Sequence, residues 1–153
     1  MYSHAFVVRD HNGRLVEAGS KCSRGNLSPD LAEALSIRDA LSWLKEKEYA
    51  NTVLESDCLQ VVQAIRSSFV CFSYLGRVVD ECHKLLVSLS SKNVKFKFVK
   101  RSANKVAHYL ARYNCSMAVR SWRVGDVHPE FHPSCKRYSK VMKVILLGAK
   151  KSI

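Results

Sequence analysis

A switch in hydrophobic spacing between residues 75 and 98 constrains the fold of this chain more than any other sequence feature. Apolar residues first recur at the three- and four-residue intervals of a helix with one buried face, at positions 75, 78, 79, 82, 85, 86 and 89. From Val94 the pattern becomes alternation, because lysines separate Val94, Phe96 and Phe98, which predicts a half-buried strand with a basic outer face. A helix followed at once by such a strand indicates an architecture in which helices pack on a sheet.

The rest of the chain repeats this mixture of strands and helices. The residue types at 10–13, Asp-His-Asn-Gly, favour a hairpin turn, and Ser-Pro-Asp at 28–30 predicts the start of a helix. In chain order we expect strands at 5–8 and 15–19, a helix to about Lys47, a strand at 51–57, helices at 58–65 and 75–89, a strand at 94–98, and a helix capped by Ser102. This order predicts an α/β fold with a mixed sheet.

Charge points to a polyanionic partner. The chain has 25 lysines and arginines against 13 aspartates and glutamates, a net charge of +12, which favours nucleic acid first and an acidic membrane second. Half of that excess falls within residues 119–153, so we expect a domain at 1–118 and a basic C-terminal tail at 119–153. Because no apolar run could span a bilayer and the start lacks a secretory signal, we expect a soluble intracellular protein, nuclear or cytoplasmic.

The cysteines and histidines give no strong metal or disulfide signal. The six cysteines are irregularly spaced without a CxxC pair, which favours reduced thiols, and three of them lie in apolar helical patterns: Cys58, Cys82 and Cys115. His128, His132 and Cys135 have a spacing that would suit zinc on a helix, but Pro129 and Pro133 argue against a continuous helix there.

Two carboxylates stand out by position. Glu33 shares a helix face with apolar residues at 37, 40 and 44, and Asp57 ends the strand at 51–57, where an α/β sheet presents its ligand-binding edge. Two such acids could share Mg²⁺, which prefers oxygen ligands. Alternatively, Glu33 is a helix-edge acid near the macrodipole and Asp57 is a helix cap.

Four ordered segments resemble a known family. The chain is similar to the type 1 ribonuclease H-like domain, which is common in plants and related to retroelement reverse transcriptases. The similar segments are the hairpin at 8–13, Ala32-Glu33-Ala34, Glu55-Ser56-Asp57-Cys58 and the stretch 99–112. The resemblance covers roughly residues 4–118. It implies a ribonuclease H-like mixed sheet with flanking helices.

The resemblance also implies an activity. Members of the family cleave the RNA strand of RNA–DNA hybrids with two Mg²⁺ or Mn²⁺ ions and need no small-molecule cofactor. Glu33 and Asp57 would then be metal-binding catalytic carboxylates. His108 stands where the last carboxylate is expected and would be a third catalytic residue, although a structural role for that histidine is equally open.

The sequence departs from the family pattern at its start. The family's first strand, which carries the bridging catalytic aspartate, has no counterpart before Met1, and Asp10 belongs to the hairpin turn instead. We therefore expect weak Mg²⁺ or Mn²⁺ binding and impaired turnover, and we expect the strand at 51–57 to expose an edge. Residues 141–147 could fill the empty position, but a free or loosely packed tail is the favoured expectation.

A basic run across the last predicted strand and the following helix favours contact with an RNA–DNA hybrid or another duplex. We assign to that contact Lys95, Lys97, Lys100, Arg101, Asn104 and Lys105. The alternative is a solvated lysine face. Three functions therefore stay open: a metal-dependent hybrid ribonuclease, a catalytically inactive nucleic-acid-binding module, and a retroelement-type remnant that does not fold stably.

Overall fold

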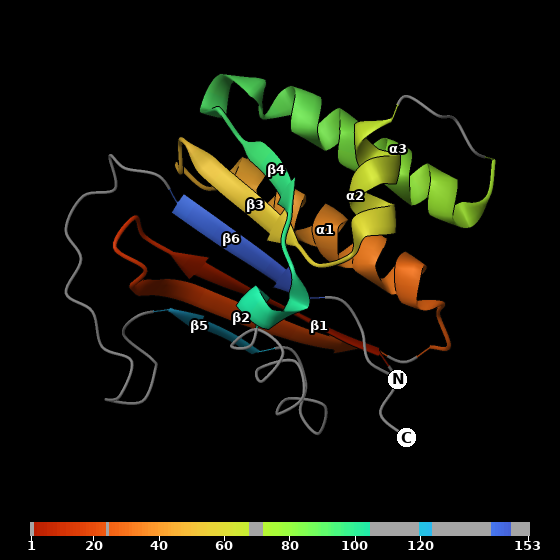
Figure 1. Cartoon of the computed structure of the whole chain (residues 1–153), viewed down its shortest axis with the longest axis horizontal. Coiled ribbons are helices and arrows are strands. Elements are labelled where there is room, and N and C mark those ends of the chain that lie inside the picture. The colour runs from red at the N-terminus through yellow and green to blue at the C-terminus, as the bar shows by residue number, and fades with distance from the viewer. Residues whose placement is uncertain (1, 24, 68–71, 105–119, 124–141, 148–153) are drawn as a thin grey trace.

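In the computed structural model, the described part of the chain forms one six-stranded mixed sheet with three α-helices (Figure 1). The structure describes residues 2–23, 25–67, 72–104, 120–123 and 142–147. In chain order the elements are β1 (Tyr2–Arg9), β2 (Leu15–Ser23), α1 (Pro29–Glu46), β3 (Thr52–Ser56), α2 (Leu59–Arg66), α3 (Tyr74–Ser88), the 3₁₀ turn η1 (Ser90–Lys92), β4 (Lys95–Phe98), the 3₁₀ turn η2 (Arg101–Asn104), β5 (Arg120–Arg123) and β6 (Met142–Leu147). The predicted α/β class with a mixed sheet is confirmed.

The hairpin of β1 and β2 explains the position of Asp10. One carboxylate oxygen of Asp10 accepts hydrogen bonds from the backbone amides of Asn12 and Arg14, both at 2.9 Å. Gly13 has φ +77°, a conformation that glycine adopts without strain. Asp10 is therefore a turn residue in the structure, in agreement with its interpretation from the sequence.

The order of the strands is β4-β3-β6-β1-β2-β5. β6 pairs parallel with β3 and antiparallel with β1, so it lies inside the sheet (Figure 1). The expectation of a free or loosely packed segment is therefore wrong for residues 142–147. The expected exposed edge on β3 is wrong for the same reason, because β3 pairs with β4 on one side and with β6 on the other.

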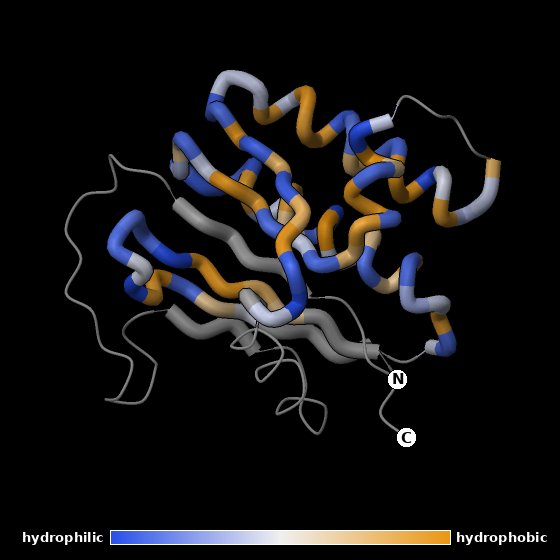
Figure 2. Tube along the Cα trace, viewed as in Figure 1, coloured by the Kyte–Doolittle hydropathy of each residue, from blue (hydrophilic) through white to orange (hydrophobic). Residues whose placement is uncertain are grey.

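Helix α1 anchors the core. Ser28 caps its N-terminus by accepting a hydrogen bond from the Leu31 amide, and the helix contacts β1, β6, α2 and α3. Ile37, Leu41 and Leu44 are fully buried. Figure 2 shows apolar residues concentrated in the strands and along the helices, and polar residues in the turn between β1 and β2.

The helix predicted from Ser102 is described only at its start, as η2, and the rest of it lies outside the described residues. Among the helices that are described, none has the length and apolarity needed to cross a bilayer.

Candidate nucleic-acid interface and carboxylate site

Asp57 lies at the edge where the parallel strands β3 and β4 end. The amide of Val99 donates a hydrogen bond of 2.9 Å to the carbonyl of Ser56, so the chain leaving β4 stays beside the end of β3. The Asp57 side chain is 8% exposed. Parallel strands present their carboxyl ends on one edge of a sheet, where α/β proteins bind ligands.

Glu33 approaches the same region from the second turn of α1. Ile37, Ala40 and Leu44, which share its helix face, are all buried, and the Oε2 atom of Glu33 is itself buried. The acid therefore lies on the inward side of the helix, as its alignment with the apolar stripe predicted.

Cys58 shows that the acids share one neighbourhood. Burial raises the pKa of the Cys58 thiol above its usual value, a hydrogen bond from the Val61 backbone opposes this, and the negative charges of Glu33, Asp30 and Asp57 raise the pKa further. The Sγ atom of Cys58 lies 3.9 Å from Oδ1 of Asp30. Negative charge from Glu33 and Asp57 therefore acts on the same thiol, and a metal site shared by the two carboxylates stays a prediction.

A cation also lies beside Asp57. The Nε atom of Arg101 is 4.0 Å from Oδ2 of Asp57, and the Arg101 side chain is 60% exposed. From the sequence, Arg101 was predicted to contact nucleic acid, and its pairing with Asp57 was not predicted. The signal was available, since residues that follow two neighbouring parallel strands meet at the same edge.

The strands on either side of β3 are apolar and basic in sequence. In the register of β3 with β6, Glu55 lies opposite Ile145, so residues 146 and 147 continue alongside Ser56 and Asp57. β6 has the sequence Met-Lys-Val-Ile-Leu-Leu and β4 the sequence Lys-Phe-Lys-Phe, so neither neighbour of β3 brings a carboxylate to this edge. Within the described ranges, no three His, Cys, Asp or Glu side chains form a group that could hold a metal ion.

The basic run lies on the outer strand of the sheet. Lys95, Lys97 and Lys100 are exposed, as is Arg101. β4 pairs only with β3 among the described strands, so one of its long edges is open in this part of the chain. A protein contacts the phosphates of a duplex with accessible cations of this kind.

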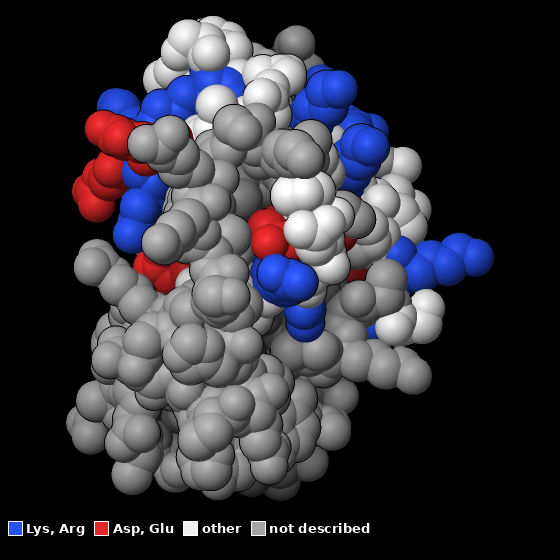
Figure 3. Space-filling model, turned by 90° about the vertical axis from the view of Figure 1, so that its left-hand side faces the viewer, with Lys and Arg blue, Asp and Glu red and all other residues white. Residues whose placement is uncertain are grey.

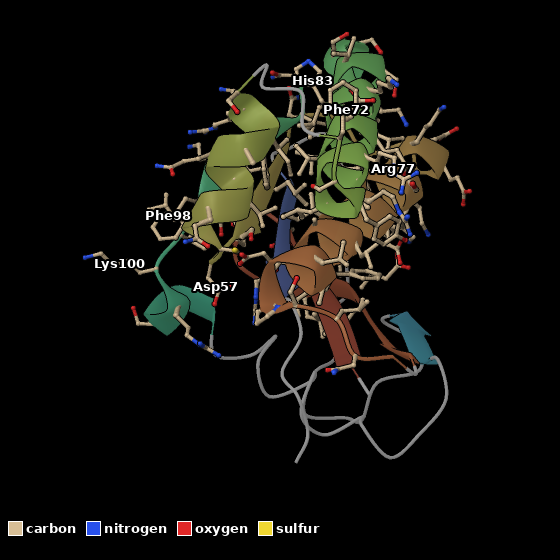
Figure 4. All side chains as sticks on the ribbon, turned by 90° about the vertical axis from the view of Figure 1, so that its right-hand side faces the viewer. Asp57, Phe72, Arg77, His83, Phe98 and Lys100 are labelled. Atoms are coloured by element: carbon tan, nitrogen blue, oxygen red, sulfur yellow. The ribbon has the colours of Figure 1, made fainter. Side chains whose placement is uncertain are left out.

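Phe98 departs from the expected strand pattern. Phe96 is buried, as predicted, but Phe98 is 38% exposed instead of facing the core. In Figure 4, Phe98 and Lys100 extend outward on the same side of the molecule, and Asp57 lies further inward. The predicted alternation of buried and exposed residues in β4 therefore holds at Phe96 and fails at Phe98.

Charge on the described part of one face of the molecule is mixed. At the end of the molecule shown in Figure 3, lysine and arginine side chains are spread over much of the described surface, and acidic side chains gather in smaller areas between them. A lysine or arginine on this surface is thus not by itself a sign of a nucleic-acid contact.

Several predicted site residues lie outside the described side chains. His108 and Lys105 are not among the described residues, and Asn104 is described only through its backbone in η2. His128, His132, Cys135 and Cys115 also lie outside the described residues. The described site therefore consists of Glu33, Asp57 and the cations that follow them in the chain.

Comparison with known protein families gives a match over most of the chain. The profile of the family described as reverse transcriptase-like, which is a ribonuclease H-like family, matches residues 3–114. No curated protein matches the chain.

Proposed function

Because the chain belongs to the reverse transcriptase-like family of ribonuclease H-like domains, we propose that it binds nucleic acid duplexes and that RNA–DNA hybrids are its preferred class. The observation that supports this best is the row of exposed cations Lys95, Lys97, Lys100 and Arg101 on β4 and just beyond it, beside Asp57. Such cations contact phosphates and position a duplex without reading its sequence. Recognition of a hybrid would rest on groove shape and 2′-hydroxyls.

We further propose that Glu33 and Asp57 hold Mg²⁺ or Mn²⁺ only weakly, so that cleavage of the RNA strand is slow. The support is the donor set: two carboxylates from α1 and the end of β3, with a guanidinium 4.0 Å from one of them. Mg²⁺ demands near-ideal octahedral geometry and is poorly held when few anionic ligands are present.

A second candidate is a nucleic-acid-binding module without catalysis. The apolar and basic sequence of β6, which lies next to β3, favours it, because a third carboxylate is not supplied from that strand. Both candidates require the same binding surface and differ only in turnover.

Binding is tested with a labelled hybrid at several salt concentrations. The logarithm of the affinity should fall linearly with the logarithm of the salt concentration, because phosphate contacts release counterions. The variant Lys95→Gln/Lys97→Gln should reduce that slope by about two, since each phosphate contact contributes about one. A flat salt response would contradict the proposed surface.

The control is Lys45→Gln/Lys84→Gln, which removes the same charge from exposed lysines of α1 and α3. It should leave the slope within error of the parent protein. If the two double variants behave alike, net charge rather than the β4 surface drives binding.

Turnover is tested on the same hybrid with Mg²⁺ or Mn²⁺. If slow cleavage occurs, Glu33→Gln and Asp57→Asn should each abolish it while binding persists. Cleavage that survives both substitutions would exclude the carboxylates as its source, and binding without cleavage in the parent would favour the second candidate.

A further inference from the structure

Phe98 is an exposed aromatic residue at the edge of the sheet that carries Asp57. It is the last residue of β4, its register partner in β3 is Ser56, and Asp57 follows Ser56 directly. Leu59 begins α2 three residues after Ser56 and is 46% exposed. Two large apolar side chains are therefore open to solvent where β3 and β4 end.

The backbone on either side of Phe98 is held in place. Arg66 of α2 donates a hydrogen bond of 2.5 Å from Nη2 to the carbonyl of Phe96, and the Val99 amide donates one of 2.9 Å to the carbonyl of Ser56. These bonds tie the end of β4 to α2 and to β3. The backbone that carries the Phe98 ring therefore needs no rearrangement when a ligand packs on the ring, which lowers the entropic cost of binding.

Cations follow Phe98 at the surface. Lys100 and Arg101 come two and three residues later, and both are exposed. In Figure 4, Phe98 and Lys100 extend outward on the same side of the molecule. An apolar ring alone would suit many partners, but a ring bordered by cations favours an anionic one. A nucleotide has this combination, because its base has a π face and its phosphate is negatively charged.

The other exposed aromatic residues among the described side chains have different surroundings. Phe72 is 96% exposed and Tyr74 is 52% exposed, both at the start of α3. The Arg77 guanidinium already lies over the Tyr74 ring, 5.6 Å from its centroid, and the exposed acid Glu81 follows one turn later in the helix. Figure 4 shows Phe72 and Arg77 beside α3, well apart from Phe98. These rings therefore lack the purely basic surroundings of Phe98.

We propose that Phe98, together with Leu59 at the same edge, is a stacking site for an unpaired base of a single-stranded nucleic acid. Lys100 and Arg101 contact the phosphates next to that base. The proposal rests on the proposed contact with nucleic acid and extends it from a duplex to a single strand. Stacking of this kind tolerates any sequence, because every base has a π face.

The test compares two single-stranded probes of equal length, oligothymidylate and an oligomer with the same phosphates but abasic sugars. The difference in affinity measures the contribution of the bases, since the charge is the same. The full chain should bind oligothymidylate about 10-fold more tightly than the abasic oligomer. Equal affinity for the two probes would overturn the proposal, and this comparison needs no variant.

Phe98→Leu should remove most of that preference, because it deletes the aromatic face and keeps an apolar side chain. Phe98→Trp should keep the preference or increase it, since a larger ring stacks over a larger area. Tyr74→Leu is the matched control: it removes an exposed ring from α3 and should leave the preference unchanged. A preference that persists at the parent value in Phe98→Leu would overturn the proposal.

A long blunt RNA–DNA hybrid separates this proposal from the proposed function. Its bases are paired, so Phe98→Leu should change its affinity by less than about twofold, because phosphate contacts position a duplex. If the hybrid binds with the proposed salt dependence but the two single-stranded probes bind equally, the stacking site alone is wrong. If the hybrid does not bind while the preference for bases persists, the proposed function is wrong and the stacking site is supported.

Discussion

The guanidinium of Arg101 and the carboxylate of Asp57 meet across the ends of β4 and β3, with Nε 4.0 Å from Oδ2. A cation in this place competes with a divalent ion for the same carboxylate, because like charges repel at short range. If the proposed function holds, Arg101 would attract phosphate and would also weaken the binding of a divalent ion at Asp57.

Arg101→Gln is expected to tighten Mn²⁺ binding several-fold while it weakens hybrid binding. Titration calorimetry with Mn²⁺ alone measures the first effect, and the salt-dependent hybrid titration measures the second. Lys100→Gln is the control, since it removes a neighbouring charge, and it should weaken hybrid binding with a smaller effect on Mn²⁺. Equal Mn²⁺ affinity in the parent and Arg101→Gln would show that the guanidinium does not influence the site.

Because the thiol of Cys82 is buried, we expect the free energy of unfolding to fall at alkaline pH. Burial is the main cause that raises the pKa of the Cys82 thiol from 9.0 to about 12. Above pH 9 the folded state therefore keeps a thiol proton that the unfolded state releases. The contribution of Cys82 to the free energy of unfolding is fully present below pH 9 and is lost as the pH rises toward 12. The slope is at most about 1.4 kcal/mol per pH unit.

Urea unfolding at several pH values from 8 to 10.5 measures this slope. Cys82→Ala lowers the overall stability because it leaves a cavity, but it should show a shallower decline above pH 9 than the parent. If the free energy of unfolding falls equally with pH in the parent and in Cys82→Ala, groups other than Cys82 cause the loss of stability at alkaline pH.

Lys92 stabilises the C-terminus of α1 from a distant part of the chain. Its ammonium donates hydrogen bonds to the carbonyls of Leu44 at 3.2 Å, Lys45 at 3.0 Å and Lys47. A cation at the carbonyl end of a helix also complements the helix dipole. Lys92→Gln should therefore lower the free energy of unfolding by about 1–2 kcal/mol, whereas Lys95→Gln on exposed β4 should change it by less than about 0.5 kcal/mol. Chemical denaturation decides between this result and a negligible role for Lys92.

Gly19 is required by the ring of Phe6, its partner across the β1–β2 ladder. A Cβ atom at position 19 would lie 2.6 Å from Cζ of Phe6, and that ring packs on Trp43 with a centroid separation of 5.0 Å. Gly19→Ala should therefore destabilise the protein by about 1–3 kcal/mol. In a Phe6→Leu background the same substitution should cost less, because the ring is gone; an equal cost in both backgrounds would mean that backbone effects dominate.

Most elements could be predicted from the sequence because their signals are local. The helix at 75–89 and the start of α1 at Ser28-Pro29 were placed within a residue or two, since periodicity and capping act over a few positions. Phe98 was misplaced because alternation assumes a covered face, and exposure at the end of an edge strand depends on what packs there.

The position of β6 could not be predicted with the same certainty. An apolar run at 142–147 indicates a strand, but its partners β1 and β3 lie in the first part of the chain, and no local pattern specifies that pairing. The pair of Arg101 and Asp57 was missed for a related reason, because the two residues become neighbours only when β3 and β4 align in parallel.

The central place of β6 has a consequence for how the protein is made. During synthesis, β1 and β3 leave the ribosome well before residues 142–147, so the described sheet cannot close until β6 has emerged. Contacts between such distant segments slow folding, and unpaired strand edges are open to aggregation in the meantime. A nascent chain that stalls after β4 would leave the edges of β1 and β3 that face β6 unpaired, and such edges can pair with other chains.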